Sequence, residues 1–400
     1  MVLPSLDTLS TELLLKIFKY LDICELCKLK QTCRRFNDIL ETWGHSFIKN
    51  VKLLVTNQIH PVIINRSARL LSPFERLRIS RNWKLGVYSE KSLLYSKAKY
   101  IPWLQLEKDL LWLSRDGYVK AYRRNSKGIN TKQGKLELKF ADLCKKIITY
   151  SVGKRKYRLQ SLTQYTINIS SDGSLWLWSV RNQKFVFDRE NCHGADINSV
   201  DMSDDIMVSG SRDNYVKIWR KPVDDDPDFK IDNEKIDLFD RVWSVALSED
   251  AKSLLAIGTA GISSRSTVTI HDMINQKFVV KLGSERFGAG VLDIKWDTPS
   301  TLWSCGYDAH LRRWDLRSGK CEQAFEDPCE SVMYCFQHDH FNSIISGTQS
   351  NGRVVLWDTR QKNYVQMYFM DSCRRREKSS PVYSLSYDAE FLFTVTDRHK

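Results

Sequence analysis

The chain has 400 residues, of which 42% are hydrophobic and 27% are charged. This balance excludes a wholly disordered or collagen-like chain. Because a single core stops growing at roughly 250–300 residues, the length predicts several packing units or a repeat array. The net charge of +13 is unevenly spread: residues 1–158 carry 32 basic and 13 acidic side chains, and residues 159–400 carry 29 and 35. Any electrostatic argument therefore concerns the N-terminal part.

Targeting signals and cysteines point to the cell interior. Residues 1–30 contain no basic segment followed by an apolar run, so we expect no secretory signal. No stretch reaches 18 consecutive apolar residues, so we expect no membrane span. The ten cysteines lack the spacing of a disulfide scaffold. We therefore expect a protein of the cytoplasm, the nucleus or both.

Residues 1–50 form the first predicted unit, a pair or trio of short amphipathic helices. In residues 8–21 and again in 24–40, apolar residues recur at the spacing that lines one face of a helix. Helices of this size cannot bury their apolar faces alone. We therefore expect them to pack on a partner or on an adjoining domain.

The motif LSTELLLKIFKYLDICELCKLKQTCRRFNDIL, followed by Trp43, resembles an F-box. One departure is Ser10, where the family usually has proline. The resemblance implies docking on the Skp adaptor and, through it, on cullin and RING-box subunits. The residues implied in adaptor binding are Leu13, Leu14, Ile17, Phe18, Leu21, Leu26, Leu29 and Phe36. The alternative is an amphipathic helical hairpin packed on its own chain.

Residues 51–97 are predicted to be a helical linker. Ser72 and Pro73 are a typical cap and first position of a helix, and Gly86 is a typical stop.

Residues 98–400 contain a repeat of about 40–45 residues. The segments SDGSLWLW, RDNYVKIW, YDAHLRRW and SNGRVVLW end at Trp178, Trp219, Trp314 and Trp357, and weaker copies place Tyr122 and His271 at the same position. A tight turn, an alternating strand and a closing tryptophan at this period are typical of WD-repeat propeller blades. The predicted fold is mainly β: a WD-repeat propeller of about seven blades, preceded by a small all-α F-box and a helical linker.

Two blades carry further expectations. In the third, the family implies a structural hydrogen-bonded network that contains His193, a strand hydroxyl, Asp213 and Trp219. The last blade has strands in residues 382–388 and 391–397 and no third strand before the sequence ends. Residues 92–101 would close the ring as its outer strand, so that either the last blade is incomplete or the sequence is truncated.

The order of F-box and WD repeats implies a substrate receptor of a ubiquitin ligase, which promotes ubiquitination and proteasomal degradation of its targets. Arginines on the turns of one propeller face would suit a phosphorylated or acidic protein segment. The candidate substrate-binding residues are Arg115, Arg212, Arg241, Arg265 and Tyr307. The alternative is that these are scattered surface residues. The competing function is a WD-repeat scaffold outside ubiquitination, for instance in a ribonucleoprotein.

Other chemistry is not expected. Cys24 and Cys27 lack a second ligand pair at zinc spacing, and His338 and His340 fit an ordinary turn between strands. No phosphate-binding loop or nucleophile elbow occurs, so we expect no catalytic residue, cofactor or metal. The basic tract that contains residues 154–158 is read as a solvated loop, with an acidic protein or RNA as alternatives. We do not expect nucleic acid to be the main partner.

Overall fold

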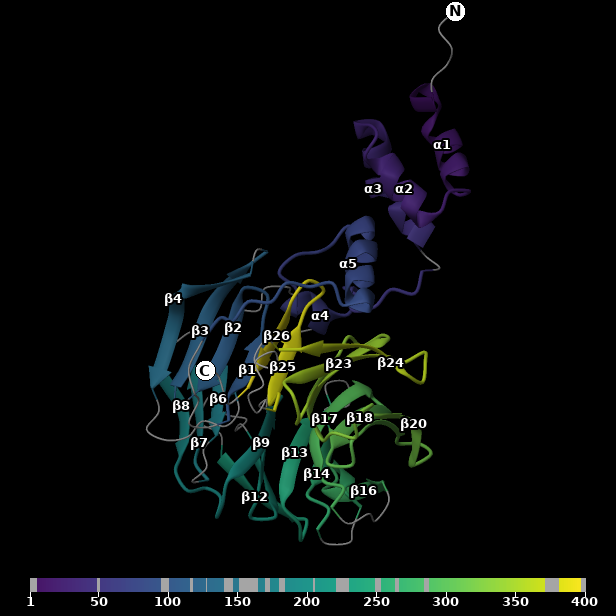
Figure 1. Cartoon of the computed structure of the whole chain (residues 1–400). Coiled ribbons are helices and arrows are strands. Elements are labelled where there is room, and N and C mark those ends of the chain that lie inside the picture. The colour runs from purple at the N-terminus through teal and green to yellow at the C-terminus, as the bar shows by residue number, and fades with distance from the viewer. Residues whose placement is uncertain are drawn as a thin grey trace, which may run out of the picture.

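Figure 1 shows the computed structural model of the chain, in which a group of helices stands away from a ring of β-sheets. The structure describes residues 6–48, 51–94, 101–115, 118–126, 128–139, 147–150, 165–169, 173–179, 184–203, 206–220, 230–248, 253–262, 266–283, 288–370 and 381–396. The basic tract at 154–158 and most of residues 92–101 lie outside these residues. Within the described part, no helix has both the length and the apolar character needed to cross a membrane.

The helices of the described residues all precede the ring. They are a 3-10 turn at Leu6–Thr8, α1 (Thr11–Phe18), α2 (Ile23–Lys30), α3 (Arg34–Ile48), α4 (Pro61–Arg66) and α5 (Pro73–Leu85). Asp22 begins α2 with a reciprocal cap: its carboxylate accepts from the Glu25 N–H at 2.7 Å, and the Glu25 carboxylate accepts from the Asp22 N–H at 2.8 Å. Such a cap contributes about 1 kcal/mol to a helix.

The helix expected in the linker is confirmed as α5. Ser72 is its N-cap, and the Ser72 N–H donates to the Glu75 carboxylate at 3.0 Å. The helix ends at Gly86, whose φ of 65° is left-handed. Glycine adopts this conformation without the steric cost of a Cβ atom, which explains why the helix stops there. The short α4 was not expected from the sequence.

The rest of the described chain forms antiparallel sheets in which strands consecutive in sequence are neighbours. The first three sheets are β1 (Trp103–Leu106), β2 (Leu110–Arg115), β3 (Tyr118–Asn125) and β4 (Gly128–Lys139); β5 (Ile147–Tyr150), β6 (Tyr165–Ile169), β7 (Leu175–Ser179) and β8 (Lys184–Arg189); and β9 (Ile197–Met202), β10 (Ile206–Ser211), β11 (Tyr215–Arg220) and β12 (Lys230–Asp237).

The remaining sheets follow the same pattern. They are β13 (Val242–Leu247), β14 (Leu254–Thr259), β15 (Val268–Asp272) and β16 (Lys277–Leu282); β17 (Val291–Thr298), β18 (Thr301–Gly306), β19 (His310–Asp315) and β20 (Lys320–Glu326); β21 (Met333–His338), β22 (Ser343–Thr348), β23 (Arg353–Asp358) and β24 (Tyr364–Phe369); and the two-stranded β25 (Ser384–Tyr387) and β26 (Leu392–Val395).

The repeat expected from the sequence is confirmed by these sheets. The closing residue of each copy lies on the third strand of its sheet: Tyr122 on β3, Trp178 on β7, Trp219 on β11, His271 on β15, Trp314 on β19 and Trp357 on β23. In the last sheet, β25 and β26 are the two strands expected in residues 382–388 and 391–397.

The sheets are arranged in a ring through their first strands. Contacts run in the order β1, β5, β9, β13, β17, β21 and β25, and β25 in turn contacts β1. Figure 1 shows the yellow β25 and β26 beside β1, so that segments from the two ends of the propeller sequence lie together. The chain is therefore mainly β, with a β-propeller that follows a small group of helices.

Helix α5 joins the helices to the ring because its two halves belong to different cores. Phe74 and Leu77, near its start, pack with the apolar side chains of α1–α3. Ile79 and Trp83, farther along, pack into a core shared with the β21–β24 and β25–β26 sheets. The Trp83 indole N–H donates to the Ala389 carbonyl at 2.8 Å. The linker helix is thus part of both packing units.

The segment before α5 is also anchored on the ring by buried hydrogen bonds. The Val55 N–H donates to the Ser343 hydroxyl at 2.7 Å. Arg66, at the end of α4, is only 6% exposed. Its guanidinium donates to the His338 carbonyl at 3.0 Å and lies 4.5 Å from the centre of the Tyr387 ring. The linker is therefore fixed against the last two sheets.

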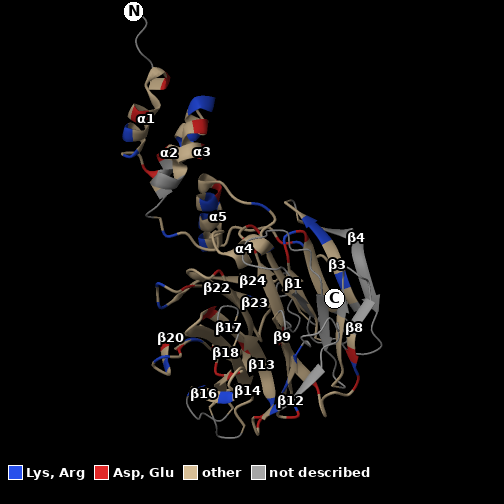
Figure 2. Cartoon of the chain, turned by 180° about the vertical axis from the view of Figure 1, so that it is seen from behind, with Lys and Arg blue, Asp and Glu red and all other residues tan. Residues whose placement is uncertain are grey.

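Part of the basic surplus of the N-terminal residues is used inside the protein. Figure 2 shows Lys and Arg on α5 and along β3. One of these residues, Arg124 on β3, is 6% exposed, forms an ion pair with Asp388 and donates to the Arg66 carbonyl at 3.1 Å. Arg124 therefore stabilises the contact between the linker, the first sheet and the last sheet.

Candidate partner-binding surfaces

Helix α1 and the turn after it present exposed apolar side chains, which we call the α1 face: Leu13 and Ile17 on the helix, and Tyr20 two residues beyond its end. Their exposed fractions are 48%, 37% and 91%, and Leu6 nearby is 46% exposed. Leu13 and Ile17 are four positions apart and therefore lie on the same side of the helix. Single exposed apolar residues are common on proteins, but a continuous apolar row is typical of an interaction surface.

The other apolar face of these helices is internal, and it contains four of the residues predicted to bind the adaptor. Leu14, Phe18, Leu26 and Phe36 are at most 6% exposed and form the core between α1, α2, α3 and α5. The rings of Phe18 and Phe36 meet edge to face at 5.6 Å. In the chain alone these four side chains therefore support the helical core, and their part in adaptor binding stays a prediction.

Two further residues of that prediction are intermediate. Leu21 and Leu29 are partly buried and pack against the same core. Of the eight residues named from the sequence, Leu13 and Ile17 remain as exposed apolar candidates. Tyr20 was missed; it lies in the turn after α1, where its N–H donates to the Ile17 carbonyl at 3.0 Å.

The hydrogen-bonded network expected in the third blade is present. His193 Nδ1 lies 2.9 Å from an Asp213 carboxylate oxygen, and its Nε2 lies 2.8 Å from the Ser209 hydroxyl. The Trp219 indole N–H donates to the same hydroxyl at 3.0 Å. His193, Ser209 and Trp219 are all buried, so the network links the turn of this blade to its inner strands and holds no open position for a substrate.

The Asp213 carboxylate is strongly stabilised by this network. Burial by itself raises the pKa of Asp213, but the hydrogen bond from His193 and two backbone N–H groups lower it to about 2. A carboxylate that accepts several hydrogen bonds is held in its charged form. Its role is therefore structural.

Two of the predicted substrate-binding residues meet around a tryptophan; we call Arg212, Trp243 and Tyr307 the Arg–Trp–Tyr patch. The Arg212 guanidinium lies 5.0 Å from the centre of the Trp243 ring. The Trp243 and Tyr307 ring centroids are 6.4 Å apart. The three residues come from three adjacent sheets, at the turn after β10, on the inner strand β13 and just after β18. Trp243 was missed, although it lies two residues after the predicted Arg241.

The surroundings of the patch are partly apolar. Arg241 is exposed, as are Phe239 and Ile262, by 61% and 48% for the latter two. Arg212 also pairs with Asp196 at 3.3 Å. The Arg115 side chain and Arg265 lie outside the part of the chain whose side chains the structure describes. The contacts among Arg212, Trp243 and Tyr307 place a cation beside two aromatic rings.

Comparisons with known proteins agree with both regions of the chain. The family model for F-box-like domains matches residues 8–49. The human F-box/WD repeat-containing protein 4 is 32% identical over 98% of this chain and 91% of its own length. Its mouse counterpart is 30% identical over 97% of this chain and 90% of its own length. Mouse transducin-like enhancer protein 2 is 26% identical over 42% of this chain and 20% of its own length.

The two F-box/WD-repeat relatives match both the helices and the ring, and their coverage extends through the linker. The helices and the repeated sheets occur in the order that the names of these relatives give, an F-box and then WD repeats. The chain belongs to the F-box/WD-repeat protein family.

Proposed function

We propose that the chain is the substrate-recognition subunit of a Skp–cullin–RING ubiquitin ligase. The observation that carries this proposal is the α1 face: an apolar row left exposed on helices that share a core with the linker helix α5. In this role the α1 face binds the Skp adaptor, which connects the chain to cullin and RING-box subunits. Membership of the F-box/WD-repeat family supports the assignment.

The chain would act without catalysing a reaction itself. It holds a target protein near a separately recruited conjugating enzyme, which raises the effective concentration of the target lysine at the site of ubiquitin transfer. The ubiquitinated target would then be degraded by the proteasome. This role places the protein in the cytoplasm, the nucleus or both.

The propeller would supply the specificity. We assign it about seven blades, the last of which has two strands among the described residues, and place the target segment on the Arg–Trp–Tyr patch. Arg212 and Arg241 offer guanidinium groups that pair with phosphate or carboxylate, and Trp243 and Tyr307 offer aromatic faces. The target segment is therefore proposed to be acidic or phosphorylated.

The adaptor contact is tested by affinity purification of the full chain and of a Leu13→Asp/Ile17→Asp variant. Both residues are exposed, so the variant should keep its fold. Adaptor binding would bury the two new charges, so the variant should no longer recover the Skp adaptor and cullin. A matched control is Ile274→Asp, which places the same charge at a 73% exposed apolar residue on the ring. Adaptor recovery from the double variant, or none from the unmodified chain, would contradict the proposal.

The target contact is tested with an Arg212→Glu/Arg241→Glu variant. It should lose captured target proteins and still recover the adaptor, because the patch lies on the ring and the α1 face does not. A matched control reverses Arg189, an exposed arginine of β8. Target capture that is unchanged in the double variant would refute the assignment of the patch and leave the adaptor contact standing.

A further inference from the structure

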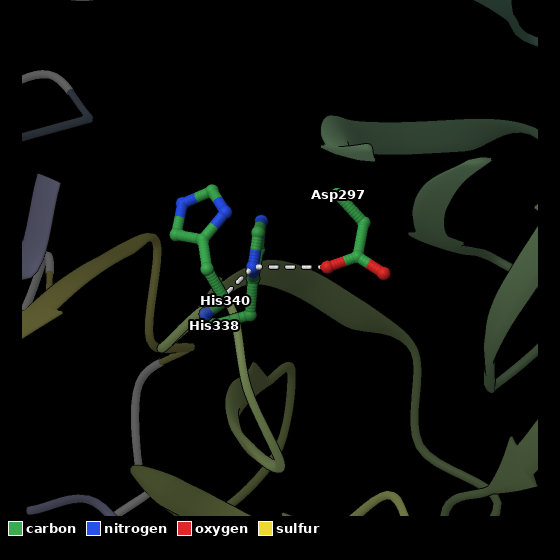
Figure 3. Close-up of side chains that lie close together, drawn as sticks. All are labelled: Asp297, His338 and His340. Carbon is green, nitrogen blue, oxygen red and sulfur yellow. Dashed lines mark hydrogen bonds and ion pairs between the residues drawn. The ribbon is translucent and has the colours of Figure 1, made fainter. Parts of the chain in front are cut away.

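Three potential metal ligands meet where two neighbouring sheets face the linker. Asp297 lies on β17, His338 is the last residue of β21, and His340 lies in the turn that follows. Their donor atoms all lie within 4.8 Å of one another. Figure 3 shows the Asp297 carboxylate directed at the His338 ring, with the His340 ring beside it. Sequence spacing could not indicate this cluster, because Asp297 belongs to the preceding sheet.

Each of the three side chains has an oxygen or nitrogen atom that could bind a metal ion. One Asp297 oxygen, Oδ2, pairs with Arg313 at 2.9 Å, whereas Oδ1 lies 3.9 Å from His338 Nδ1. His340 Nδ1 is buried and has no hydrogen-bond partner among the described residues. A buried polar atom without a partner costs about 1–3 kcal/mol, and a ligand would remove that cost. His338 Nδ1 accepts only a long hydrogen bond from the His340 backbone N–H, at 3.3 Å.

The linker holds the His340 ring in place. The His60 ring, just before α4, stacks on it with centroids 4.0 Å apart and an interplanar angle of 12°. A metal ion lies near the plane of each imidazole that binds it, so two parallel stacked rings cannot share one ion. The rings of His338 and His340 are inclined by 58°, which permits a shared ion. The ligand set is therefore two imidazoles and one carboxylate.

The positively charged side chains near the cluster each have a partner. Arg313 pairs with Asp297, Arg66 donates to the His338 carbonyl at 3.0 Å, and Lys295 pairs with Asp293 at 2.8 Å.

We propose that Asp297, His338 and His340 bind one divalent transition-metal ion of the zinc class, which links the β17–β20 sheet to the β21–β24 sheet. Two imidazoles and a carboxylate are a ligand set that zinc accepts, with water in the remaining position. A hollow lined by Asp297, His338 and Arg313 adjoins the cluster and gives that water a place. Metal–ligand distances of about 2.0–2.2 Å require the donors to approach by roughly 1 Å on binding.

The first test uses the full-length chain, stripped of metal with a chelator and titrated with Zn²⁺ in a calorimeter. We expect one equivalent bound through nitrogen and oxygen. Because the chain has ten cysteines, X-ray absorption of the loaded protein identifies the ligands: imidazole scattering supports the site. A sulfur shell at about 2.3 Å as the only protein coordination, or no zinc binding, would overturn the proposal.

The second test compares His340→Asn with the control variant His310→Asn. His310 is a partly buried histidine at the start of β19 and is not part of the cluster. Even residues that only orient a metal ligand change affinity by about 10–100-fold, so loss of a ligand should weaken zinc binding by about 100-fold or more. The His310 variant should bind as the unmodified chain does. Zinc should also raise the melting temperature of the unmodified chain and of His310→Asn, but not of His340→Asn. Equal affinity in all three proteins would refute the site.

Discussion

Replacing Trp83 by alanine should destabilise the propeller, although this residue belongs to the linker. The side chain is 8% exposed and packs in the core that α5 shares with the last two sheets. A buried tryptophan truncated to alanine costs about 3–5 kcal/mol. The Ala389 carbonyl also loses its indole donor, which adds about 1–3 kcal/mol if the group stays dry. The expected total is about 4–8 kcal/mol, a large part of the 5–15 kcal/mol that typically stabilises a domain.

The assay is urea unfolding followed by the far-ultraviolet circular dichroism of the sheets, since tryptophan fluorescence changes with the substitution itself. Trp83→Phe is the intermediate variant: it keeps most of the packing, loses the hydrogen bond and should cost about 1–2 kcal/mol. Leu85 lies on the same helix and is 58% exposed. The free energy of unfolding of Leu85→Ala should therefore be within about 0.5 kcal/mol of that of the unmodified chain. If the free energy of unfolding of Trp83→Ala were within about 1 kcal/mol of that of the unmodified chain, the linker would not stabilise the ring.

Three further substitutions test the ring itself. Gly210→Ala should destabilise the ring by about 1–3 kcal/mol in thermal unfolding, because the new Cβ atom would lie 2.5 Å from the side chain of Val242. An unchanged melting temperature would contradict this packing. Asp213→Asn should lower the free energy of unfolding by about 2 kcal/mol above pH 5, because the pKa of Asp213 in the folded chain is about 2 and the usual value is 3.8. The difference in stability between the unmodified chain and the variant should shrink as pH falls from 4 towards 2. A difference that does not change with pH would show that the carboxylate charge is not its cause. Arg353→Met should lower the free energy of unfolding in urea by about 3–5 kcal/mol, because it leaves the buried Asp327 carboxylate without its ion-pair partner. An unchanged free energy of unfolding would mean that water replaces the arginine.

The repeat and the helices could be predicted because their signals are local. The tryptophans recur at the blade period, and each lies on the third strand of its sheet. Ser72 and Gly86 mark the ends of α5 through capping chemistry that depends only on neighbouring residues.

What could not be predicted depends on contacts between distant segments. Leu13 and Leu14 are adjacent and equally apolar, yet one is 48% exposed and the other fully buried, because α3 and α5 cover only one side of α1. Arg66 gave no sign that it would be buried, since arginine is mostly a surface residue. The Arg–Trp–Tyr patch was half found: the turns that carry Arg212 and Tyr307 were visible in the repeat, but their shared contact with Trp243 exists only in the closed ring.

The two-core packing of α5 has a consequence for the order of folding during synthesis. Trp83 bonds to Ala389, which lies 306 residues later in the chain. Translation at about 5–20 residues per second takes roughly 15–60 s to cover that distance. Until then Ile79 and Trp83 of α5 lack part of their final core, and the first and last sheets cannot close on each other. Ring closure and linker docking should therefore be late, coupled steps, during which the emerging chain exposes apolar surface that a chaperone would bind.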